Sequence, residues 1–594
     1  MKMNNNALSK IVVSCCALSA AFSVSALSFH ADISLLAFPF AAAYTLVLSY
    51  FAVSKLFGIR PGAASSGGDP AFIPAVRTMM QYEPFVLLIS FVLRRAGDEG
   101  TPYVLDCIEV FLWCAVSVLV LVVLHFISPK SIRAWSPVWH QVLVDRKYEA
   151  RKGRFGRRWL LVEALGWVDA LVQAVFMVLL LNIFLVQLYE IPSESMVPEF
   201  LVKDRVVVFK VLNGPKFPLS DIGLPPVKKY GRGDIVVFRN PHYSADRKSE
   251  VRTFVSQLVF MCTLTMKNIN VDESGMPKAD PLVKRVVGVP GEQLVMVDGR
   301  LYSRTKGSPS FSVVEDDASW ACWNLNAVKE PVKKGIREFV LSADDVAAME
   351  RVERAKSALS VEEAREKCAA IADEFDSLVE GGSVSARKFG GGGEFSLSPR
   401  ELFSFAYFDG IDRKSVSLFN AANRSEWFRE FMTGWCASVP DFADDMYAES
   451  NFKLNLLFKM KFGSVVVKNV ENLLAGVPMS LWDDGGSEKD DLVSYVELLD
   501  RRSMPVFPAS ASDGTPSYIP ENYYFMMGDN RFNSLDMRHS YEPHLASLAE
   551  SDKFGVLYPS NIAPMYVPRS KILGVASYRF WPVSRKGVPG HTGM

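Results

Sequence analysis

The sequence predicts a membrane-anchored protein in which N-terminal transmembrane α-helices precede a mainly β domain that carries a large mixed α/β insertion. Three observations favour this fold class. Apolar residues make up 49% of the 594 residues, and the excess is concentrated in the first third of the chain. After residue 190, short β-branched runs alternate with Gly, Pro and Asp, as in strands and turns. Helical patterns then interrupt this strand-like texture between residues 303 and 520.

The N-terminal stretch 10–57 is almost continuously apolar and is interrupted only by HAD at 30–32. It is long enough for two helices of about the 20 residues that a bilayer requires. The first helix could instead be a cleaved signal peptide, because SVSA at 23–26 ends in small residues. The apolar run resumes at once after HAD, which favours a helical hairpin.

Further spans are expected at about 104–127 and at 168–189. If the N-terminus is cytoplasmic, an additional crossing is needed between these spans and the N-terminal hairpin. The candidate is 72–93, although it contains Arg77 and Glu83. The total is therefore four or five spans, three or four of them within residues 1–128.

The segment 129–167 between the last two spans is strongly basic. Its stretch 129–159 contains nine Lys or Arg residues against two acids. A short basic loop stays in the cytoplasm by the positive-inside rule. The span 168–189 then runs from inside to outside, and the chain after residue 190 lies on the extracytoplasmic side.

The extracytoplasmic part is expected to have three segments. Residues 190–302 and 521–594 form the β domain, with predicted strands in DRVVVFKVL, GDIVVFRNP, VKRVVGVPG, EQLVMVDGRLY, NYYFMMGDN and SKILGVASYRFW. Residues 303–520 form the insertion between them. One insertion helix is delimited by a capping box of Ser360 and Glu363 and by Gly381 as its stop, and FGGGGE at 389–394 reads as a flexible linker.

Charge and cysteine content exclude some functions. Lys plus Arg and Asp plus Glu both number 65, so the charge gives no reason to propose a nucleic acid partner. The eight cysteines form no C-x-x-C pair and have no histidines at metal-ligand spacing, so no metal site is predicted. We expect small core residues of the apolar segments at Cys15, Cys16, Cys107 and Cys114. A disulfide stays open among the other four, which are Cys262, Cys322, Cys368 and Cys436.

Two serines, Ser193 and Ser195, follow the last span directly in IPSESMVPEF. A serine hydroxyl is a poor nucleophile unless a base takes its proton. Of the seven histidines, only His539 and His544 are reasonable candidates for that base, and neither has an obvious orienting partner. A buried lysine is the alternative, because burial lowers the pKa of its ammonium group.

Lys284 is the candidate lysine, because it lies among Leu282, Val283, Val286 and Val287. On a strand it shares one face with Leu282 and Val286. The next residue, Arg285, is then expected to point the other way, out to solvent. By itself, a lysine between valines is more often only an edge-strand charge.

Four blocks in this order after a transmembrane span give a specific resemblance: PSESMVP, GDIVVFRNP, VKRVVGVPGE and MMGDNRFNSLDMR. The chain resembles type I signal peptidase, a membrane-bound Ser/Lys protease with a characteristic β fold. The resemblance covers about residues 165–300 and 520–580. It implies that Ser195 is the nucleophile, that Lys284 is the general base, and that Ser193 and the backbone N–H of Ser195 form the oxyanion hole.

The last block, GDNRFNSLDMR, supplies the remaining implied site residues. Ser534 corresponds to the serine that orients the lysine, and Asp536 and Arg538 correspond to a supporting ion pair. Asp529 and Asn530 are expected to serve the turn rather than the reaction.

The resemblance implies a serine endopeptidase that removes signal peptides from exported preproteins through an acyl-enzyme, without a metal or cofactor. The implied location is the inner (cytoplasmic) membrane, multi-pass, with the catalytic domain outside. Partners are exported preproteins and the lipid bilayer, with the secretion translocon as a further candidate. Two alternatives stay open. One is another serine enzyme, such as an acyltransferase or penicillin-binding hydrolase, although Ser195 does not begin an S-x-x-K motif. The other is a secretion factor without catalytic activity.

Two departures from the family pattern are visible. Glu199 stands where the family usually has threonine, and an acid near the membrane surface could alter substrate approach. A forty-residue stretch separates FRNP from LVKR and contains the apolar segment FVSQLVFMCTLTM at 254–266. This segment is too short to span a bilayer. We expect a surface or core segment, with an interfacial element in the outer leaflet as the alternative.

Overall fold

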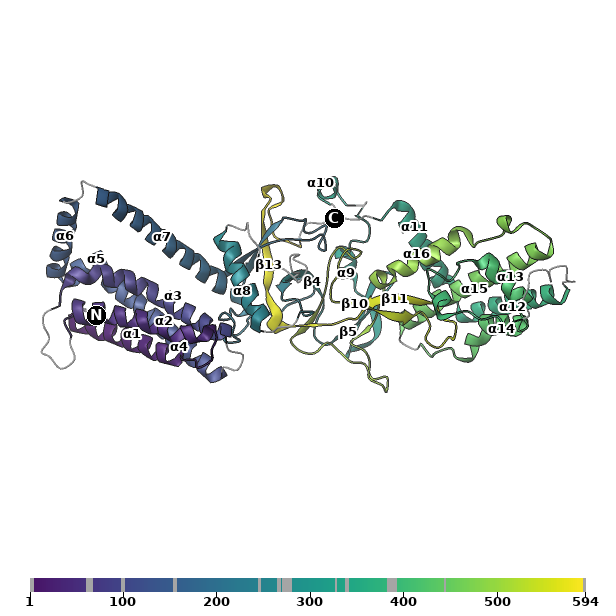
Figure 1. The fold of residues 1–594 in the computed structure, drawn as a ribbon, viewed down its shortest axis with the longest axis horizontal. Coiled ribbons are helices and arrows are strands. Elements are labelled where there is room, and N and C mark those ends of the chain that lie inside the picture. Colours follow the sequence, from purple (N-terminus) through teal and green to yellow (C-terminus); the bar gives the residue numbers. More distant parts are fainter. Residues whose placement is uncertain are drawn as a thin grey trace. The chain divides into compact units, whose positions relative to one another are not determined.

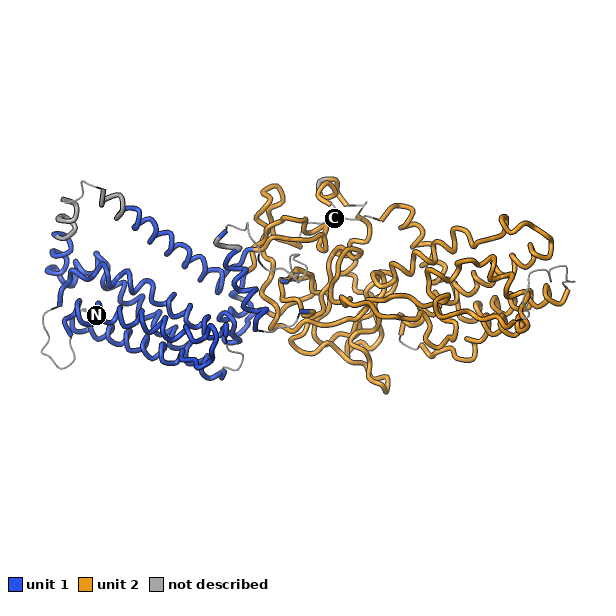
Figure 2. The backbone as a smooth tube through the Cα atoms, viewed as in Figure 1, with its two compact units in different colours: residues 1–188, 209–228, 243–280 blue, residues 189–208, 229–242, 281–594 orange. Residues whose placement is uncertain are grey.

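The computed structural model shows a chain of helices and strands that divides into two compact units (Figures 1 and 2). Unit 1 comprises residues 1–188, 209–228 and 243–280, and unit 2 comprises residues 189–208, 229–242 and 281–594. The structure describes residues 5–59, 68–97, 102–152, 157–243, 247–263, 269, 280–325, 328–336, 341–381, 393–442 and 445–590. Most of the predicted linker at 389–394 and the end of the apolar segment at 254–266 lie outside these residues.

Unit 1 is built on four helices that pack on one another and on the short helices that follow them. The four are α1 Asn5–Ser25, α2 Ala37–Ser49 with a π-helical continuation Tyr50–Leu56, α3 Ile73–Gly97 and α4 Tyr103–Phe126. Their shared core contains mostly aliphatic and aromatic side chains. The remaining helices of the unit are α5 Pro129–Trp135, α6 Pro137–Lys152, α7 Arg157–Phe184 and α8 Arg247–Cys262.

Five helical segments of the described chain are long and apolar enough to cross a membrane: Asn5–Ser25, Ile33–Leu56, Pro70–Gly97, Tyr103–Phe126 and Glu163–Phe184. This agrees with the upper number of predicted spans, including the one at 72–93. The last segment ends earlier than predicted, because the chain after Phe184 turns into the first strand of the β domain. None of its most apolar stretch is buried by protein.

The β domain contains a seven-stranded sheet with strand order β1-β2-β13-β3-β4-β9-β12. The strands are β1 Val186–Glu190, β2 Arg205–Phe209, β3 Ile235–Phe238, β4 Leu282–Gly288, β9 Tyr523–Met527, β12 Val567–Pro568 and β13 Ile572–Trp581. The strands β13, β3, β4 and β9 are paired antiparallel. The predicted β strands in these segments are therefore confirmed, and β4 lies in the interior of the sheet.

A second sheet of four strands, ordered β7-β6-β5-β8, carries both ends of the predicted insertion. Its strands are β5 Glu292–Val297, β6 Arg300–Thr305, β7 Ser308–Val313 and β8 Met504–Phe507. Because β7 and β8 fall within 303–520, the strands at the two ends of that range extend the β domain. The helices between them are α9 Glu315–Trp320, α10 Glu330–Lys333, α11 Ala343–Ala358, α12 Val361–Gly381, α13 Ile411–Asn420, α14 Arg424–Thr433, α15 Met446–Leu474 and α16 Gly486–Arg502.

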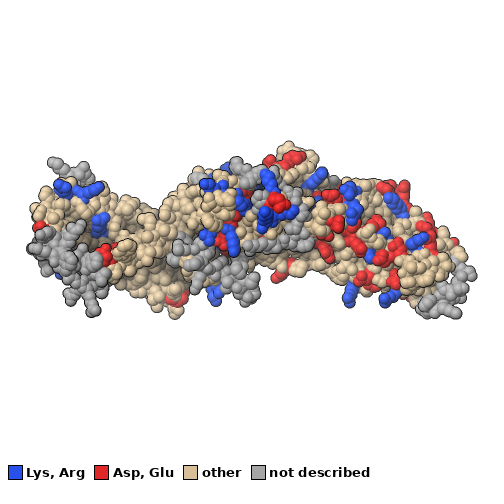
Figure 3. Space-filling view, turned by 90° about the horizontal axis from the view of Figure 1, so that it is seen from above, with Lys and Arg blue, Asp and Glu red and all other residues tan. Residues whose placement is uncertain are grey.

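The insertion helices α11 to α16 share one aromatic-rich core, to which a distant hairpin also contributes. The hairpin consists of β10 His539–Ser547 and β11 Leu557–Ile562. Its Val556 and Tyr558 are buried in the core of the helices. In Figure 3, charged side chains of both signs crowd the visible face of the insertion, whereas the visible face of the helices of unit 1 carries few.

Candidate functional site

The candidate nucleophile Ser195 lies in the turn that connects β1 to β2. The turn is closed by the Val197 N–H, which donates to the Glu194 carbonyl at 3.0 Å, and is seated by buried Met196 and Phe200. The side chain of Ser195 is only 9% exposed. These contacts hold the backbone of Ser195 in place beside the sheet.

That group is Lys284, from the interior strand β4. Its Nζ lies 2.6 Å from the Ser195 Oγ, in a hydrogen bond between residues that are far apart in sequence. Lys284 pairs in register with Val236 of β3 and is 3% exposed. Burial lowers the pKa of the Lys284 ammonium from 10.5 to about 8, although the negative charges of Asp536 and Asp529 oppose the shift. At neutral pH and above, an appreciable fraction of this lysine is therefore able to accept a proton.

The second serine of the motif lies beside the first. The Ser193 hydroxyl donates to the Ser195 Oγ at 3.3 Å, and Ser193 itself is on the exposed side of the pair. The two hydroxyls and the lysine thus form a continuous chain of polar contacts. A donor at the Ser193 position is available for an oxyanion that forms on the solvent side of Ser195.

Gly528 brings the two halves of the β domain together at this site. A Cβ atom at Gly528 would lie 2.4 Å from the Ser195 carbonyl oxygen and 2.2 Å from the Ser534 Oγ, so the position accepts no side chain. Ser534 is buried, and its hydroxyl has no hydrogen-bond partner among the described residues. The structure therefore places Ser534 close to the backbone of the nucleophile and does not join it to Lys284 by a hydrogen bond.

Asp536 and Arg538 form a buried, bidentate ion pair on the same segment. The Arg538 guanidinium donates to the two Asp536 oxygens at 2.8 and 3.0 Å, and neither residue is exposed to solvent. Burial alone would raise the pKa of Asp536, but the charge and hydrogen bonds of Arg538 hold it below the usual range. Asp536 also accepts the Gly528 N–H at 2.9 Å, so the pair fixes the start of the loop that follows β9.

The loop after Gly528 is attached directly to the turn that carries Ser195. The backbone N–H of Asn530 donates to the Ser195 carbonyl at 3.1 Å, and its side-chain amide donates to the Glu194 carbonyl at 3.2 Å. On the far side, the Cys322 N–H donates to the Asp529 carbonyl at 2.8 Å. The loop is thus held between the nucleophile turn and the first residues of the insertion.

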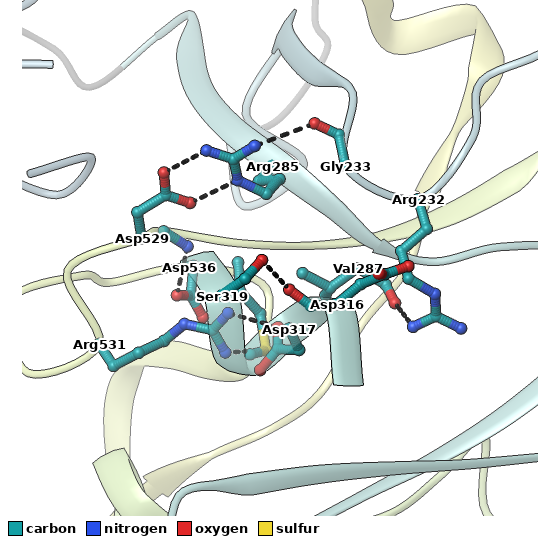
Figure 4. A network of polar contacts seen from close by, with 12 residues as sticks. Arg232, Gly233, Arg285, Val287, Asp316, Asp317, Ser319, Asp529, Arg531 and Asp536 are labelled. Atoms are coloured by element: carbon teal, nitrogen blue, oxygen red, sulfur yellow. Dashed lines mark hydrogen bonds and ion pairs between the residues drawn. The ribbon is translucent and has the colours of Figure 1, made fainter. Parts of the chain in front are cut away.

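The side chains of this loop form a network of buried charges (Figure 4). Arg285 donates two hydrogen bonds to Asp529, at 2.8 and 2.6 Å, and a third to the Gly233 carbonyl at 3.1 Å. Arg531 is fully buried and pairs at 2.5 Å with Asp317 of α9. Such pairs satisfy charges that would otherwise be costly to bury, and they fix the geometry around them.

Two expectations from the sequence are wrong here. Arg285 does not point to solvent: it is 3% exposed, and its guanidinium lies 4.9 Å from the ring centroid of Trp320. The strand β4 is covered on both faces, so alternation along it does not separate buried from exposed residues. Glu199 is not at the surface either. It is 5% exposed, and its carboxylate lies 3.9 Å from Arg285 and 3.7 Å from Arg579.

The expectation that Asp529 serves only the turn also falls short, because Asp529 is the ion-pair partner of Arg285. Sequence reasoning did not find Asp317, Cys322 or Arg531 at the site. Asp317 pairs with Arg531 and Cys322 with Asp529, and in each case about 200 residues separate the two partners in the sequence. The signal that could have found the pairs was a charged residue in the middle of each buried segment, since buried charges are normally paired.

The histidines lie elsewhere. His539 is buried, its Nε2 donates to the Asp500 carbonyl at 3.0 Å, and burial lowers its pKa to about 4. His544 is exposed on β10. Neither hydrogen-bonds Ser195 in the described part of the chain.

Among the described residues, no group of three or more His, Cys, Asp or Glu side chains is placed to hold a metal ion. The seven cysteines with described side chains are free thiols, and Cys114 is exposed rather than in a core.

Known proteins resemble the segments that build this site. The family model "Signal peptidase, peptidase S26" matches residues 164–330 and 488–581. Signal peptidase I of Pseudomonas aeruginosa is 42% identical over 66 residues, which are 11% of this chain and 23% of that protein. Signal peptidase I of Buchnera aphidicola subsp. Acyrthosiphon pisum is 29% identical over 117 residues, 20% of this chain and 26% of that protein. The chain thus spans about a quarter of the length of these relatives. No solved structure gives a significant match.

Proposed function

The segments 164–330 and 488–581 belong to the signal peptidase family, peptidase S26, and we propose that the chain is a signal peptidase I that cleaves signal peptides from exported preproteins. The observation that carries the proposal is the distance of 2.6 Å between the Lys284 Nζ and the Ser195 Oγ, with both groups buried. This is the geometry that nucleophile and base need for proton transfer.

The reaction proceeds through an acyl-enzyme. Neutral Lys284 takes the proton of the Ser195 hydroxyl while the Oγ attacks the scissile carbonyl. The oxyanion of the tetrahedral intermediate accepts hydrogen bonds from the Ser193 hydroxyl and the Ser195 N–H. Lys284 then gives its proton to the leaving amine as the peptide bond breaks. In the second half, Lys284 takes a proton from water while the water oxygen attacks the ester carbonyl, and Lys284 returns that proton to the Ser195 Oγ as the ester C–O bond breaks.

The remaining site residues have supporting roles in this proposal. Asp536 accepts the Gly528 N–H and places negative charge near Lys284, and Arg538 holds the Asp536 carboxylate in place. Ser534, whose hydroxyl lies beside Gly528, would orient the base. The catalytic domain faces the extracytoplasmic side of the inner membrane, and the chain receives preproteins there, with the secretion translocon as a candidate partner. We propose that the insertion comprises residues 303–520. The family match leaves out 331–487 of this range.

The test is cleavage of a panel of preproteins by the purified, detergent-solubilised full chain. Ser195→Ala is expected to abolish cleavage, because no other hydroxyl of the described residues is hydrogen-bonded to Lys284. The matched variant Ser193→Ala, two residues away, is expected to retain weak activity, since loss of one oxyanion donor costs about 10²–10³ in kcat. If Ser193→Ala were the inactive variant and Ser195→Ala cleaved normally, the assignment would be reversed. If the wild-type chain cleaved no preprotein, the proposal of a secretion factor without catalytic activity would replace it.

A further inference from the structure

The helix α8 in unit 1 carries small polar residues on its buried side and apolar residues on its outer side. Thr253 and Ser256 are each 3% exposed, whereas Val255 is 41% exposed. Successive residues turn by about 100° around a helix of 3.6 residues per turn. Val251 and Leu258 therefore lie opposite Thr253 and Ser256, on the same side as Val255. A helix that faces water has the reverse arrangement, with its apolar stripe inward.

This apolar stripe is not part of a protein core. The helix packs against α3, and yet no residue of α8 with a described side chain belongs to the hydrophobic cores of the described chain or packs on them. The inward residues are small, which allows a close approach of α8 to its neighbour. Small residues inside and large apolar residues outside are typical of helices in contact with lipid.

The first turn of α8 is fixed at the end of a candidate transmembrane helix. Arg247 and Arg95 both donate to the carbonyl of Leu219, at 2.8 and 2.9 Å. Arg95 is in the last turn of α3, which ends the apolar segment Pro70–Gly97. A helical segment of this length rises about 40 Å, more than the hydrocarbon thickness of about 30 Å, so its end lies in the headgroup region. The helix α8 therefore begins at that depth.

The charges on α8 fit the same location. Lys248 and Arg252 are exposed beside the apolar stripe, and the one acid, Glu250, is paired with Arg247 at 3.0 Å. Basic residues that flank an apolar stripe are characteristic of helices that lie in the membrane interface and contact anionic headgroups.

We propose that α8 is an interfacial helix that lies in the outer leaflet of the membrane crossed by α1 to α4. Its stripe of Val251, Phe254, Val255 and Leu258 enters the boundary between headgroups and acyl chains. Lys248 and Arg252 contact anionic phospholipid headgroups. This assignment requires that the helices of unit 1 span the bilayer, and it is independent of the proposed peptidase activity.

The experiment uses the full chain in nanodiscs of phosphatidylethanolamine and phosphatidylglycerol. Benzoylphenylalanine, which is photoreactive, is incorporated in place of Val255, and the irradiated protein is examined for lipid adducts by mass spectrometry. The same residue in place of Leu171, exposed in the span of α7, is the positive control, and in place of Glu366, exposed on α12, it is the negative control. A lipid adduct at 255 and 171 and none at 366 is the expected result.

Two results at position 255 would overturn the proposal while position 171 reacts with lipid. One is the absence of a lipid adduct, and the other is a cross-link to protein, either within the chain or to a second copy. The charge contribution is tested in the same assay. We expect the yield of the 255 adduct to fall when phosphatidylcholine replaces phosphatidylglycerol, and the double variant Lys248→Glu, Arg252→Glu to lose that dependence. A yield that ignores lipid charge in the unmodified helix would contradict the headgroup contact.

Discussion

Lys284 is placed where its charge is costly and its neutral form is useful. The side chain projects from an interior strand, is 3% exposed and contacts the Ser195 Oγ. Burial lowers the pKa of its ammonium to about 8, while the nearby Asp536 and Asp529 prevent a larger fall. The carboxylates of the surrounding ion pairs therefore help to set the pKa of Lys284.

The activity of the wild-type chain should rise with pH through the pKa of Lys284. Below pH 8 the lysine is mostly protonated and cannot accept the Ser195 proton, so activity falls about tenfold for each pH unit. Above pH 8 the rate should level off. The measurement is the rate of preprotein cleavage between pH 5 and pH 10. A rate that declines above neutral pH, with no rising limb near pH 8, would be inconsistent with Lys284 as the base.

Folding stability should depend on pH through the same group. The pKa of Lys284 is lower in the folded state, about 8, than its ordinary value of 10.5, so between these values the unfolded chain binds more protons. Stability contributed by this group therefore rises from pH 8 to pH 10.5, and below pH 8 the buried ammonium is a constant cost. Burial of Lys284 beside Ser195 thus reduces the stability of the domain at neutral pH.

Sequence reasoning predicted the pairing of Ser195 with Lys284 because ordered motifs identify both residues even though 89 positions separate them. It failed at Arg285 and Glu199 for a physical reason. Alternation along a strand and nearness to a membrane predict exposure only if one side of the element remains open. Here the loop after β9 and Trp320 cover the second face of β4, and those segments come from distant parts of the chain.

Among the elements, the loop from Gly528 to Arg531 is hydrogen-bonded directly to the turn that carries Ser195. It accepts a hydrogen bond from the Cys322 N–H and donates to the carbonyls of Glu194 and Ser195. The Arg285–Asp529 pair joins the same loop to the strand that carries the base. Base and nucleophile are therefore held through one loop.

Removing one partner of this pair should destabilise the domain strongly. Arg285→Met leaves the Asp529 carboxylate buried without its bidentate donor, a loss of about 3–5 kcal/mol in the free energy of unfolding. The double variant Arg285→Met, Asp529→Leu should recover most of it, because no unpaired charge remains. Denaturant unfolding of the full chain in detergent measures the effect. Arg365→Met, which breaks an exposed pair with Glu362, is the matched control and should change little. Equal unfolding of Arg285→Met and Arg365→Met would refute the role assigned to the buried pair.

The strands and helices themselves were largely predictable from local pattern. The helix α12 begins after Ser360, whose hydroxyl accepts the Glu363 N–H at 3.1 Å, and ends at Gly381, as the capping box and the glycine indicate. The hairpin of β10 and β11 was not predicted to join the insertion. Its Val556 and Tyr558 enter a core formed by helices that precede it by many residues. Local periodicity carries no information on such contacts.

For the whole molecule, the sequence separates an apolar helical part from a β domain that is interrupted by a helical insertion. The described chain has five helical segments that are long and apolar enough to cross a membrane, and the family match is split into 164–330 and 488–581. The sequence did not predict that the nucleophile segment and the insertion share one compact unit. That arrangement depends on pairings between residues such as Asp317 and Arg531, which no local pattern connects.

Topology follows from the basic loop and can be tested on intact cells. The nine basic residues at 129–159 favour a cytoplasmic location for that segment, and we propose that the β domain and insertion then lie outside. An impermeant thiol reagent should label Glu430→Cys in intact cells and His140→Cys only after permeabilisation, with the parent chain as the control for native cysteines. Labelling of position 140 from outside would reverse the orientation and would remove Ser195 from exported substrates.

The most direct test of the Ser195–Lys284 assignment is preprotein cleavage by Lys284→Ala, measured beside His539→Ala at pH 8. Lys284→Ala is expected to be inactive, because among the residues that the structure describes no other base hydrogen-bonds the Ser195 hydroxyl. His539→Ala is expected to keep activity wherever it folds, since the imidazole hydrogen-bonds the Asp500 carbonyl and not Ser195. Circular dichroism of both variants shows whether each is folded. An active, folded Lys284→Ala chain would contradict the Ser/Lys mechanism, whereas an inactive one beside an active His539→Ala is the result that the structure predicts.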